Sequence, residues 1–322
     1  MSMPDWMGRA ARLGLIVLSL VALLGSAMLV LAPNPRSFAV QAATRGLTVT
    51  VDHAAMSKWL LERALVCFRN DARVSAAPMP DGAVCDPGLY DVRSVRNLEL
   101  EWASATQLQI TRTGPKSPLT IRMVAPGAEP VLVDDRALSR ADLVIVPSAD
   151  WLDNGALTIA GDVRVGSRPG PGEAGIVMSG SYSVSERLVL AQRPVVLARG
   201  ELFSGDEAQI RVRDGDDTKP AQVFGFIEPR NDGEAGFAVT LYSEVSDSIL
   251  HVDRFGARGI ETNPSWVDRA LANPSLLGAS AMLALASGLA NLGFLGRVMA
   301  WAWRRRDANA ISPSPAAPPP AS

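Results

Sequence analysis

Apolar and polar residues alternate along the middle of the chain, between about residues 89 and 255. Leu98, Leu100 and Trp102, for example, are separated by single polar residues. A period of two directs successive side chains to opposite faces of a strand, so the alternation predicts half-buried strands. The same pattern or a short apolar run predicts further strands near residues 108–110, 119–123, 131–133, 143–146, 157–165, 176–184, 188–190, 195–202, 210–212, 223–227, 237–242 and 249–252.

Turn residues separate these predicted strands. Asp153-Asn154-Gly155 and Asn231-Asp232-Gly233 are two examples. Many short strands about 8–12 residues apart are typical of a sandwich or a barrel. No long helical pattern intervenes that would favour a parallel sheet. We therefore expect a mainly β, antiparallel, β-sandwich-like domain over residues 47–260. A β-solenoid is the alternative, although the glycines of this part follow no fixed period.

Residues 52–68 follow a different period. Five apolar side chains recur there at helical spacing, namely Met56, Trp59, Leu60, Ala64 and Cys67. Asp52 is a candidate N-cap, and Lys58 and Glu62 lie four positions apart on the other side. The pattern predicts one amphipathic helix packed on the β domain; a helix lying on a membrane surface is the alternative. We expect residues 33–46 to form a linker and residues 70–88 a loop.

Two long apolar runs enclose this central part. Residues 13–32 are twenty residues without a charge, preceded by Arg9 and Arg12. A helix of that length spans about 30 Å, the thickness of the hydrocarbon core of a bilayer. The run therefore predicts a transmembrane helix. A cleaved signal peptide is the alternative, although its apolar region usually covers only about 7–15 residues. Both interpretations send the downstream chain across the membrane.

The second run, residues 275–296, is again uncharged and again long enough to span. Trp301, Trp303 and the Arg304–Arg306 cluster follow it and indicate a cytoplasmic flank. A buried helix of a soluble domain is the alternative. Together the two runs predict a cytoplasmic N-terminus (1–12), a first span (13–32), a linker (33–46), a periplasmic β domain (47–260), a juxtamembrane segment (261–274) with a short helix near 266–271, a second span (275–296) and a disordered cytoplasmic tail (297–322).

Small residues recur on one face of the second predicted span. Ser280, Ala284 and Gly288 are four positions apart, and Asn291 lies close to the same face. Small side chains allow helices to approach closely, and an intramembrane Asn can bond across the contact. We expect this face to pack against another helix and to support a homo-oligomer. A lipid-facing helix, or pairing with the small residues of the first span, remains open.

Composition and charge indicate the compartment of the protein and argue against nucleic acid as its partner. The net charge is −2, so no basic field favours nucleic acid. Arginine far outnumbers lysine, which is typical of a GC-rich bacterial genome, and no Asn lies in a usable glycosylation sequon. Cys67 and Cys85 are the two cysteines, and both lie in the exported part. An oxidising compartment and an even count predict a disulfide between them.

No catalytic signature emerges from the motifs. Asp253 near His251 is a candidate base–orienter pair, Ser57-Lys58 is a candidate Ser/Lys pair, and the turn 214–217 is a candidate calcium loop. A strand histidine, two neighbours on opposite faces and a solvated turn are the structural alternatives, and we favour them. The chain has no phosphate loop and no G-x-S-x-G motif. We expect no cofactor and no metal site.

The expected function is therefore structural. We expect a bacterial inner-membrane protein that acts as a non-enzymatic scaffold or accessory subunit of a cell-envelope assembly, in secretion or polysaccharide export. Its partners would be the membrane and other inner-membrane or periplasmic proteins. A periplasmic enzyme acting on glycans or lipids, with carboxylates from separate strands, is the alternative. The layout resembles that of polysaccharide chain-length regulators in topology only, because their domain is rich in long helices.

Overall fold

The structure is a computed structural model. It describes residues 21, 36–70, 85–167, 175–187, 194–215, 217–230, 234–245, 248–272, 278 and 281. The chain divides into two compact units, Ala32–Ala272 and Met1–Leu31 with Asn273–Ser322. In the second unit only Val21, Gly278 and Ala281 are described, and all three are helical. No helix within the described residues is both long and apolar enough to cross a membrane. The two predicted spans otherwise lie outside those residues.

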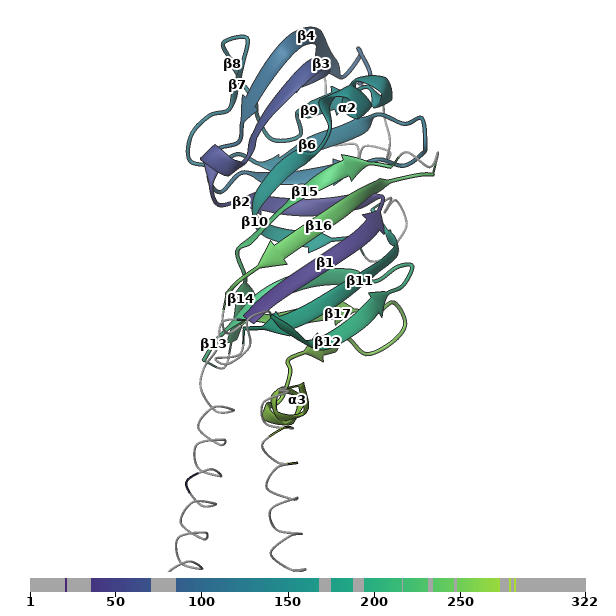
Figure 1. Cartoon of the computed structure of the whole chain (residues 1–322). Coiled ribbons are helices and arrows are strands. Elements are labelled where there is room, and N and C mark those ends of the chain that lie inside the picture. The colour runs from purple at the N-terminus through teal and green to yellow at the C-terminus, as the bar shows by residue number, and fades with distance from the viewer. Residues whose placement is uncertain are drawn as a thin grey trace, which may run out of the picture. The chain divides into compact units, whose positions relative to one another are not determined.

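The unit Ala32–Ala272 is mainly β and antiparallel, which confirms the predicted fold class at that level (Figure 1). Besides the strands it contains a single 3-10 turn, η1 (Ala54–Met56), and two short helices among the described residues, α2 (Ser148–Asn154) and α3 (Trp266–Ala272). The strands are β1 (Arg36–Thr44), β2 (Gly46–Val51), β3 (Lys58–Arg69), β4 (Tyr90–Glu101), β5 (Gln107–Thr111), β6 (Leu119–Ala125), β7 (Leu132–Val133), β8 (Arg136–Ala137), β9 (Leu143–Val146), β10 (Leu157–Val165), β11 (Val177–Glu186), β12 (Val195–Leu202), β13 (Glu207–Asp214), β14 (Asp217–Pro220), β15 (Val223–Pro229), β16 (Phe237–Ser243), β17 (Ser248–Asp253) and β18 (Ile260–Thr262).

One sheet contains all the described strands except the small β7–β8 pair. Its order is β12-β11-β1-β16-β15-β10-β2-β5-β6-β9-β3-β4, and β13 adds a branch that carries β14, β17 and β18. The branch point is β10, whose first half pairs with β15 and whose second half pairs with β2 and, at its end, with β13. Gly161 lies at the crossing point. Its φ is +150°, and a Cβ there would lie 2.0 Å from the carbonyl oxygen of Thr50, so only glycine fits.

The predicted amphipathic helix over residues 52–68 is wrong, because this segment is the strand β3. Trp59 and Leu61 are buried at odd positions, whereas Ala64 and Val66 are buried at even ones. The parity changes opposite Asn97 of β4, which adopts a φ of +52° and interrupts the pairing between the two strands. The buried residues Leu61 and Ala64 are therefore three positions apart, whereas neighbouring buried residues of a regular strand are two apart. A spacing of three is typical of a helix, which explains the wrong prediction.

The predicted linker over residues 33–46 is also wrong. Arg36–Thr44 is β1, a central strand that pairs with β11 on one side and with β16 on the other. Phe38, Val40 and Ala42 alternate into the core. Elsewhere the predicted strands 143–146, 157–165 and 195–202 match β9, β10 and β12, while the predicted strand 188–190 lies outside the described residues.

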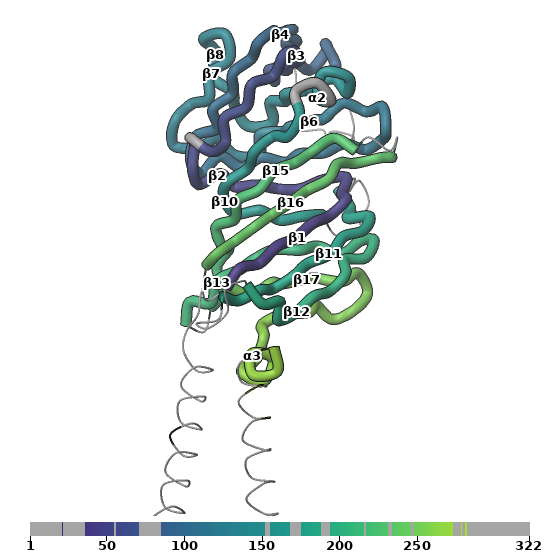
Figure 2. The backbone as a smooth tube through the Cα atoms, in the orientation of Figure 1, coloured from purple at the N-terminus to yellow at the C-terminus, as the bar shows by residue number. Residues whose placement is uncertain are grey.

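The hydrophobic core is continuous through both branches of the sheet. Trp59 and Trp102 meet edge to face, with ring centroids 5.5 Å apart. The indole Nε1 of Trp59 also donates to the carbonyl oxygen of Thr158 in β10 at 2.6 Å, which joins the β3–β4 end of the unit to the branch strand. Trp151 of α2 packs edge to face on Phe237 at 6.0 Å. Figure 2 shows how the chain path carries these segments, distant in sequence, into one stack of strands.

Candidate functional site

A buried carboxylate links the beginning of the unit Ala32–Ala272 to its end. Glu186, at the end of β11, has a side chain that is 0% exposed and lies between two arginines. Its Oε2 atom is 3.4 Å from Nε of Arg36 and 3.0 Å from Nε of Arg269. Neither contact has hydrogen-bond geometry, so charge attraction dominates both. Two cations compensate the cost of burying one carboxylate. We call these three side chains the ion cluster.

Local structure positions each member of the ion cluster. Arg36 opens β1 and lies opposite Glu186 in the antiparallel register of β1 and β11. Arg269 lies one turn inside α3. That helix begins with a capping box, in which the Asp268 carboxylate accepts from both the backbone N–H and the hydroxyl of Ser265, and the Ser265 hydroxyl accepts from the Asp268 N–H. These hydrogen bonds hold the pKa of Asp268 below its ordinary value.

Arg36 also reaches the segment between β18 and α3. Its Nη1 donates to Oδ1 of Asn263 at 2.7 Å, and its Nη2 donates to the carbonyl oxygen of Pro264 at 3.4 Å. A cavity of about 290 Å³ opens beside this contact, lined by Arg36, Arg213, Gly215, Ile249 and Asn263. Two hydrogen bonds therefore join the first residue of β1 to the segment that precedes α3.

A polar face lies on the neighbouring strands β1, β11 and β12. Its members lie on one face of these paired strands and are exposed or half-buried: Ala39, Gln41, Ser179, Ser181, Ser183, Ser185, Arg199 and Glu201. We call this set the serine face. Two shallow cavities of about 570 and 490 Å³ lie on it, and both are lined by Gln41, Ser181 and Glu201. Hydroxyl, amide and ionic groups are thus presented together on a broad surface.

The candidate base–orienter pair exists but does not resemble a catalytic pair. Nε2 of His251 lies 3.3 Å from Oδ2 of Asp253, and its Nδ1 lies 3.7 Å from Oε1 of Glu261 on β18. Both ring nitrogens therefore face carboxylates of the same sheet. A general base needs one nitrogen directed at a substrate. The histidine thus lies in the pairing between β17 and β18, where its surroundings are those of a strand residue.

The other candidate chemical groups have structural surroundings. Ser57 is buried, whereas Lys58 points outward and pairs with Glu99 of β4 rather than with Glu62. The hydrogen bond and the charge of Glu99 raise the pKa of Lys58, which opposes a role as a neutral base. The candidate calcium loop is the turn between β13 and β14, where Asp214 pairs with Lys219 at 2.5 Å. Within the described part of the chain, no group of three metal-ligating side chains exists.

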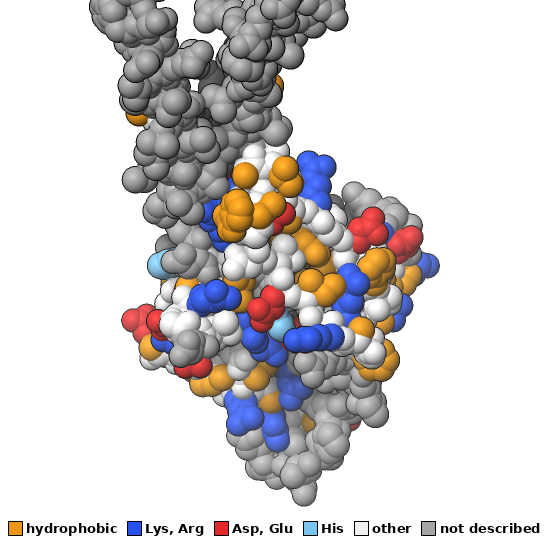
Figure 3. All heavy atoms as spheres, turned by 90° about the horizontal axis from the view of Figure 1, so that it is seen from below, with side chains coloured by type: hydrophobic (Ala, Val, Ile, Leu, Met, Phe, Trp, Pro, Cys, Tyr) orange, Lys and Arg blue, Asp and Glu red, His pale blue; other side chains and the backbone are white. Residues whose placement is uncertain are grey.

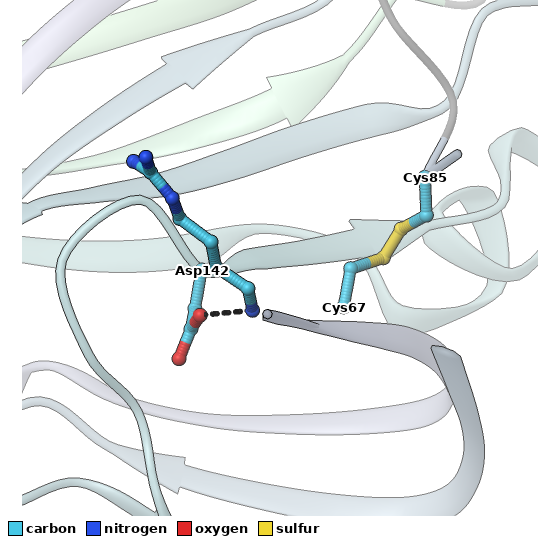
Figure 4. The surroundings of a disulfide bond; sticks show 4 residues. Cys67, Cys85 and Asp142 are labelled. Carbon is cyan, nitrogen blue, oxygen red and sulfur yellow. Dashed lines mark hydrogen bonds between the residues drawn. A yellow bond between two sulfur atoms is a disulfide. The ribbon is translucent and has the colours of Figure 1, made fainter. Parts of the chain in front are cut away.

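The predicted disulfide is present. Cys67 of β3 is bonded to Cys85, with Cα atoms 6.0 Å apart and a sequence separation of 18 (Figure 4). Beside it, the buried carboxylate of Asp142 accepts from the backbone N–H of Arg69 at 2.6 Å. The bond therefore ties Cys85 to β3 near the end of that strand, beside the hydrogen bond between Arg69 and Asp142. The predicted helix-packing residues Ser280, Ala284, Gly288 and Asn291 lie outside the described residues.

Sequence reasoning missed the ion cluster and the serine face. The three charged members of the cluster are separated by 150 and 83 positions, so no local spacing connects them. The serine face did carry a signal, since Ser179, Ser181 and Ser183 alternate along the predicted strand 176–184 and Ser185 continues the alternation just after it. Comparisons with family models, with curated proteins and with solved structures find no match for this chain. The ion cluster and the serine face are therefore the two features from which a function can be inferred.

Proposed function

We propose that this chain is a bacterial inner-membrane protein whose β-sandwich-like unit is displayed in the periplasm by two flanking transmembrane helices, with both termini in the cytoplasm. It acts there as a non-enzymatic scaffold or accessory subunit of a cell-envelope assembly, such as a secretion or polysaccharide-export machine. Its partners are other inner-membrane or periplasmic proteins, and the helix over residues 275–296 contributes to self-association.

The ion cluster is the observation that carries this proposal. Arg36 follows the apolar run 13–32 by four positions, and α3 ends three positions before the run 275–296. Because Arg36 and Arg269 both contact Glu186, the described chain begins and ends its path through the β unit at the same buried carboxylate. A hairpin of two spans requires this arrangement, since both helices must enter one membrane from one side.

The serine face supports the scaffold role. It combines hydroxyls, an amide, one cation and one anion over neighbouring strands, and its cavities are shallow. Such a surface suits a broad polar contact with a partner more than it suits enclosure of a small substrate. The alternative enzyme on glycans requires two carboxylates about 5–10 Å apart. Among the described residues that line the two cavities of this face, Glu201 is the sole carboxylate.

Protease protection in spheroplasts tests the topology. Protease added outside should digest the β unit and leave the two predicted spans and the tail 297–322 protected, and carbonate washing should leave the chain in the membrane. Protection of the β unit until the membrane is lysed would contradict the proposed orientation.

Partner binding is tested by affinity purification of the tagged full chain after mild cross-linking. Ser181→Arg places a long cation in the middle of the serine face and should remove specific envelope proteins from the purified set. Lys219→Glu, an exposed change on β14, is the control and should leave that set intact. Identical sets for both variants and the wild type would exclude the serine face as the binding surface.

A further inference from the structure

The helix α3 exposes apolar side chains and directs a cation toward the β unit, which is the reverse of a helix on the surface of a soluble domain. Its apolar residues Trp266, Val267 and Leu271 are 64%, 42% and 65% exposed. Its cation Arg269 instead points inward, with a side chain that is only 16% exposed and lies on buried Glu186. A surface helix of a globular protein normally turns its apolar stripe toward the core and its charges outward.

The outward residues form one continuous surface. At 100° per residue, Trp266, Ala270, Val267 and Leu271 cover an arc of about 140° around the helix axis. Arg269 lies on the other side of the helix. The three large side chains of this arc are exposed and Ala270 is half-buried, so the β unit leaves most of the arc uncovered. We call these four residues the apolar arc.

The orientation of the apolar arc is held by specific contacts. The capping box between Ser265 and Asp268 sets the first turn, and the contact between Arg269 and Glu186 sets the rotation of the helix about its axis. Rotating α3 to bury Trp266 would withdraw Arg269 and leave the carboxylate of Glu186 buried with only Arg36 beside it. Loss of one partner of a buried ion pair is strongly destabilising.

The chain that follows α3 identifies what covers the arc. Ala272 is three positions before the uncharged run 275–296. Three extended residues reach about 10 Å, and the headgroup region of a bilayer is about 5–8 Å thick on each side. If the run 275–296 spans, the end of α3 therefore lies at most about 10 Å from the hydrocarbon core, in the headgroup region or directly beside it. Trp side chains are enriched at that level, and short amphipathic helices bury their apolar face there.

We propose that α3 is an interfacial helix that lies on the periplasmic leaflet, with the apolar arc in the boundary between headgroups and acyl chains. The ion pair between Arg269 and Glu186 then connects this helix to the β unit. Figure 3 shows the corresponding end of the unit from below, with hydrophobic side chains exposed among Lys and Arg. The inference rests on the proposed membrane anchoring and adds a second, peripheral contact with the same bilayer.

The test measures the depth of α3 in the full chain, reconstituted in phospholipid nanodiscs. A nitroxide on Leu271→Cys reports collision with oxygen, which is concentrated in the acyl region, and with a water-soluble nickel chelate. The label enters only this site, because the two native cysteines are joined in a disulfide. Leu132→Cys on β7 is the matched control, a leucine that is 55% exposed at the β3–β4 end of the unit.

We expect oxygen to dominate at position 271 and the nickel chelate to dominate at position 132. Tryptophan fluorescence provides a second measurement without a label. Brominated lipids should quench wild-type protein more than Trp266→Phe, because the remaining tryptophans are common to both.

Chelate accessibility at position 271 equal to that at position 132 would overturn the interfacial helix. Spectral broadening at 271 that disappears on dilution with unlabelled protein would overturn it in favour of a contact between two copies. Carbonate extraction separates these results from a failure of the proposed function. A chain that carbonate removes from the membrane has no span, and then both proposals fail. A chain that stays in the membrane with a water-exposed position 271 retains its anchors and loses only the interfacial helix.

Discussion

Arg36 donates a hydrogen bond to Asn263 across 2.7 Å, although 227 positions separate the two residues. The contact joins the first residue of β1 to the segment that leads into α3. Glu186 reinforces it from β11, so the two ends of the β unit share one buried charge. Forces applied to either predicted span would reach the β unit at this place.

Removing the charge of Glu186 tests how much this contact stabilises the fold. Glu186→Gln leaves Arg36 and Arg269 close together without their anion, and breaking a buried pair of this kind costs about 3–5 kcal/mol. Urea unfolding of the full chain in detergent, followed by tryptophan fluorescence, should show the loss. Glu99→Gln is the control, because its carboxylate pairs with Lys58 at an exposed position. An unfolding midpoint for Glu186→Gln equal to that of Glu99→Gln would show that the cluster contributes nothing to stability.

The disulfide between Cys67 and Cys85 should stabilise the β3 end of the unit. Closing a loop of 18 positions is worth about 3 kcal/mol in the chain-entropy model. Cys85→Ser should therefore lower the free energy of unfolding by about that amount, and Cys67→Ser by more, because Cys67 is fully buried in the strand. Maleimide–polyethylene glycol should label denatured wild-type protein only after reduction. Complete labelling without a reductant, in protein taken from its native compartment, would contradict the bond.

Asp162 predicts a pH-dependent change in stability. Burial raises its pKa, and the hydrogen bond from Gln209 compensates only in part. A raised pKa in the folded state means that the favourable contribution of the protonated group is complete below the unfolded pKa of about 3.8 and is lost as the pH rises through the folded pKa. Asp162→Asn should thus unfold at a higher temperature than wild type at pH 7, and the difference should vanish near pH 3. A difference that is independent of pH would exclude desolvation as its cause.

The predicted helix-packing face is tested by a change of volume at one position. Gly288→Leu places a large side chain among the small residues Ser280 and Ala284 and should abolish association of the spans in a membrane two-hybrid assay. Ala286→Leu adds a similar side chain on the other side of the helix and should leave association nearly unchanged. Equal loss for both substitutions would mean that the four-residue spacing has no role.

Sequence patterns were sufficient for most strands and for the disulfide, because each depends on local or countable features. Alternation identifies a strand whose faces differ, as in β9, β10 and β12. It failed at β3, where the interruption at Asn97 moved the buried positions from Leu61 to Ala64 and produced a helical spacing. It also failed at β1, because the small and polar residues of this segment are typical of a linker. The segment is a strand because it pairs with β11 on one side and with β16 on the other. The ion cluster was beyond reach because tertiary structure alone brings its members together.

The position of β1 in the sheet has a consequence for how the protein is made. It is among the first strands to be synthesised, yet its partner β16 ends at Ser243, close to the end of the β unit. At about 5–20 residues per second, roughly 10–40 s pass between the synthesis of β1 and that of β16. Phe38 and Val40 have no complete cover during that interval. The nascent chain therefore contains an incompletely paired, aggregation-prone strand during most of its synthesis. A chaperone that binds β1 should raise the yield of folded protein.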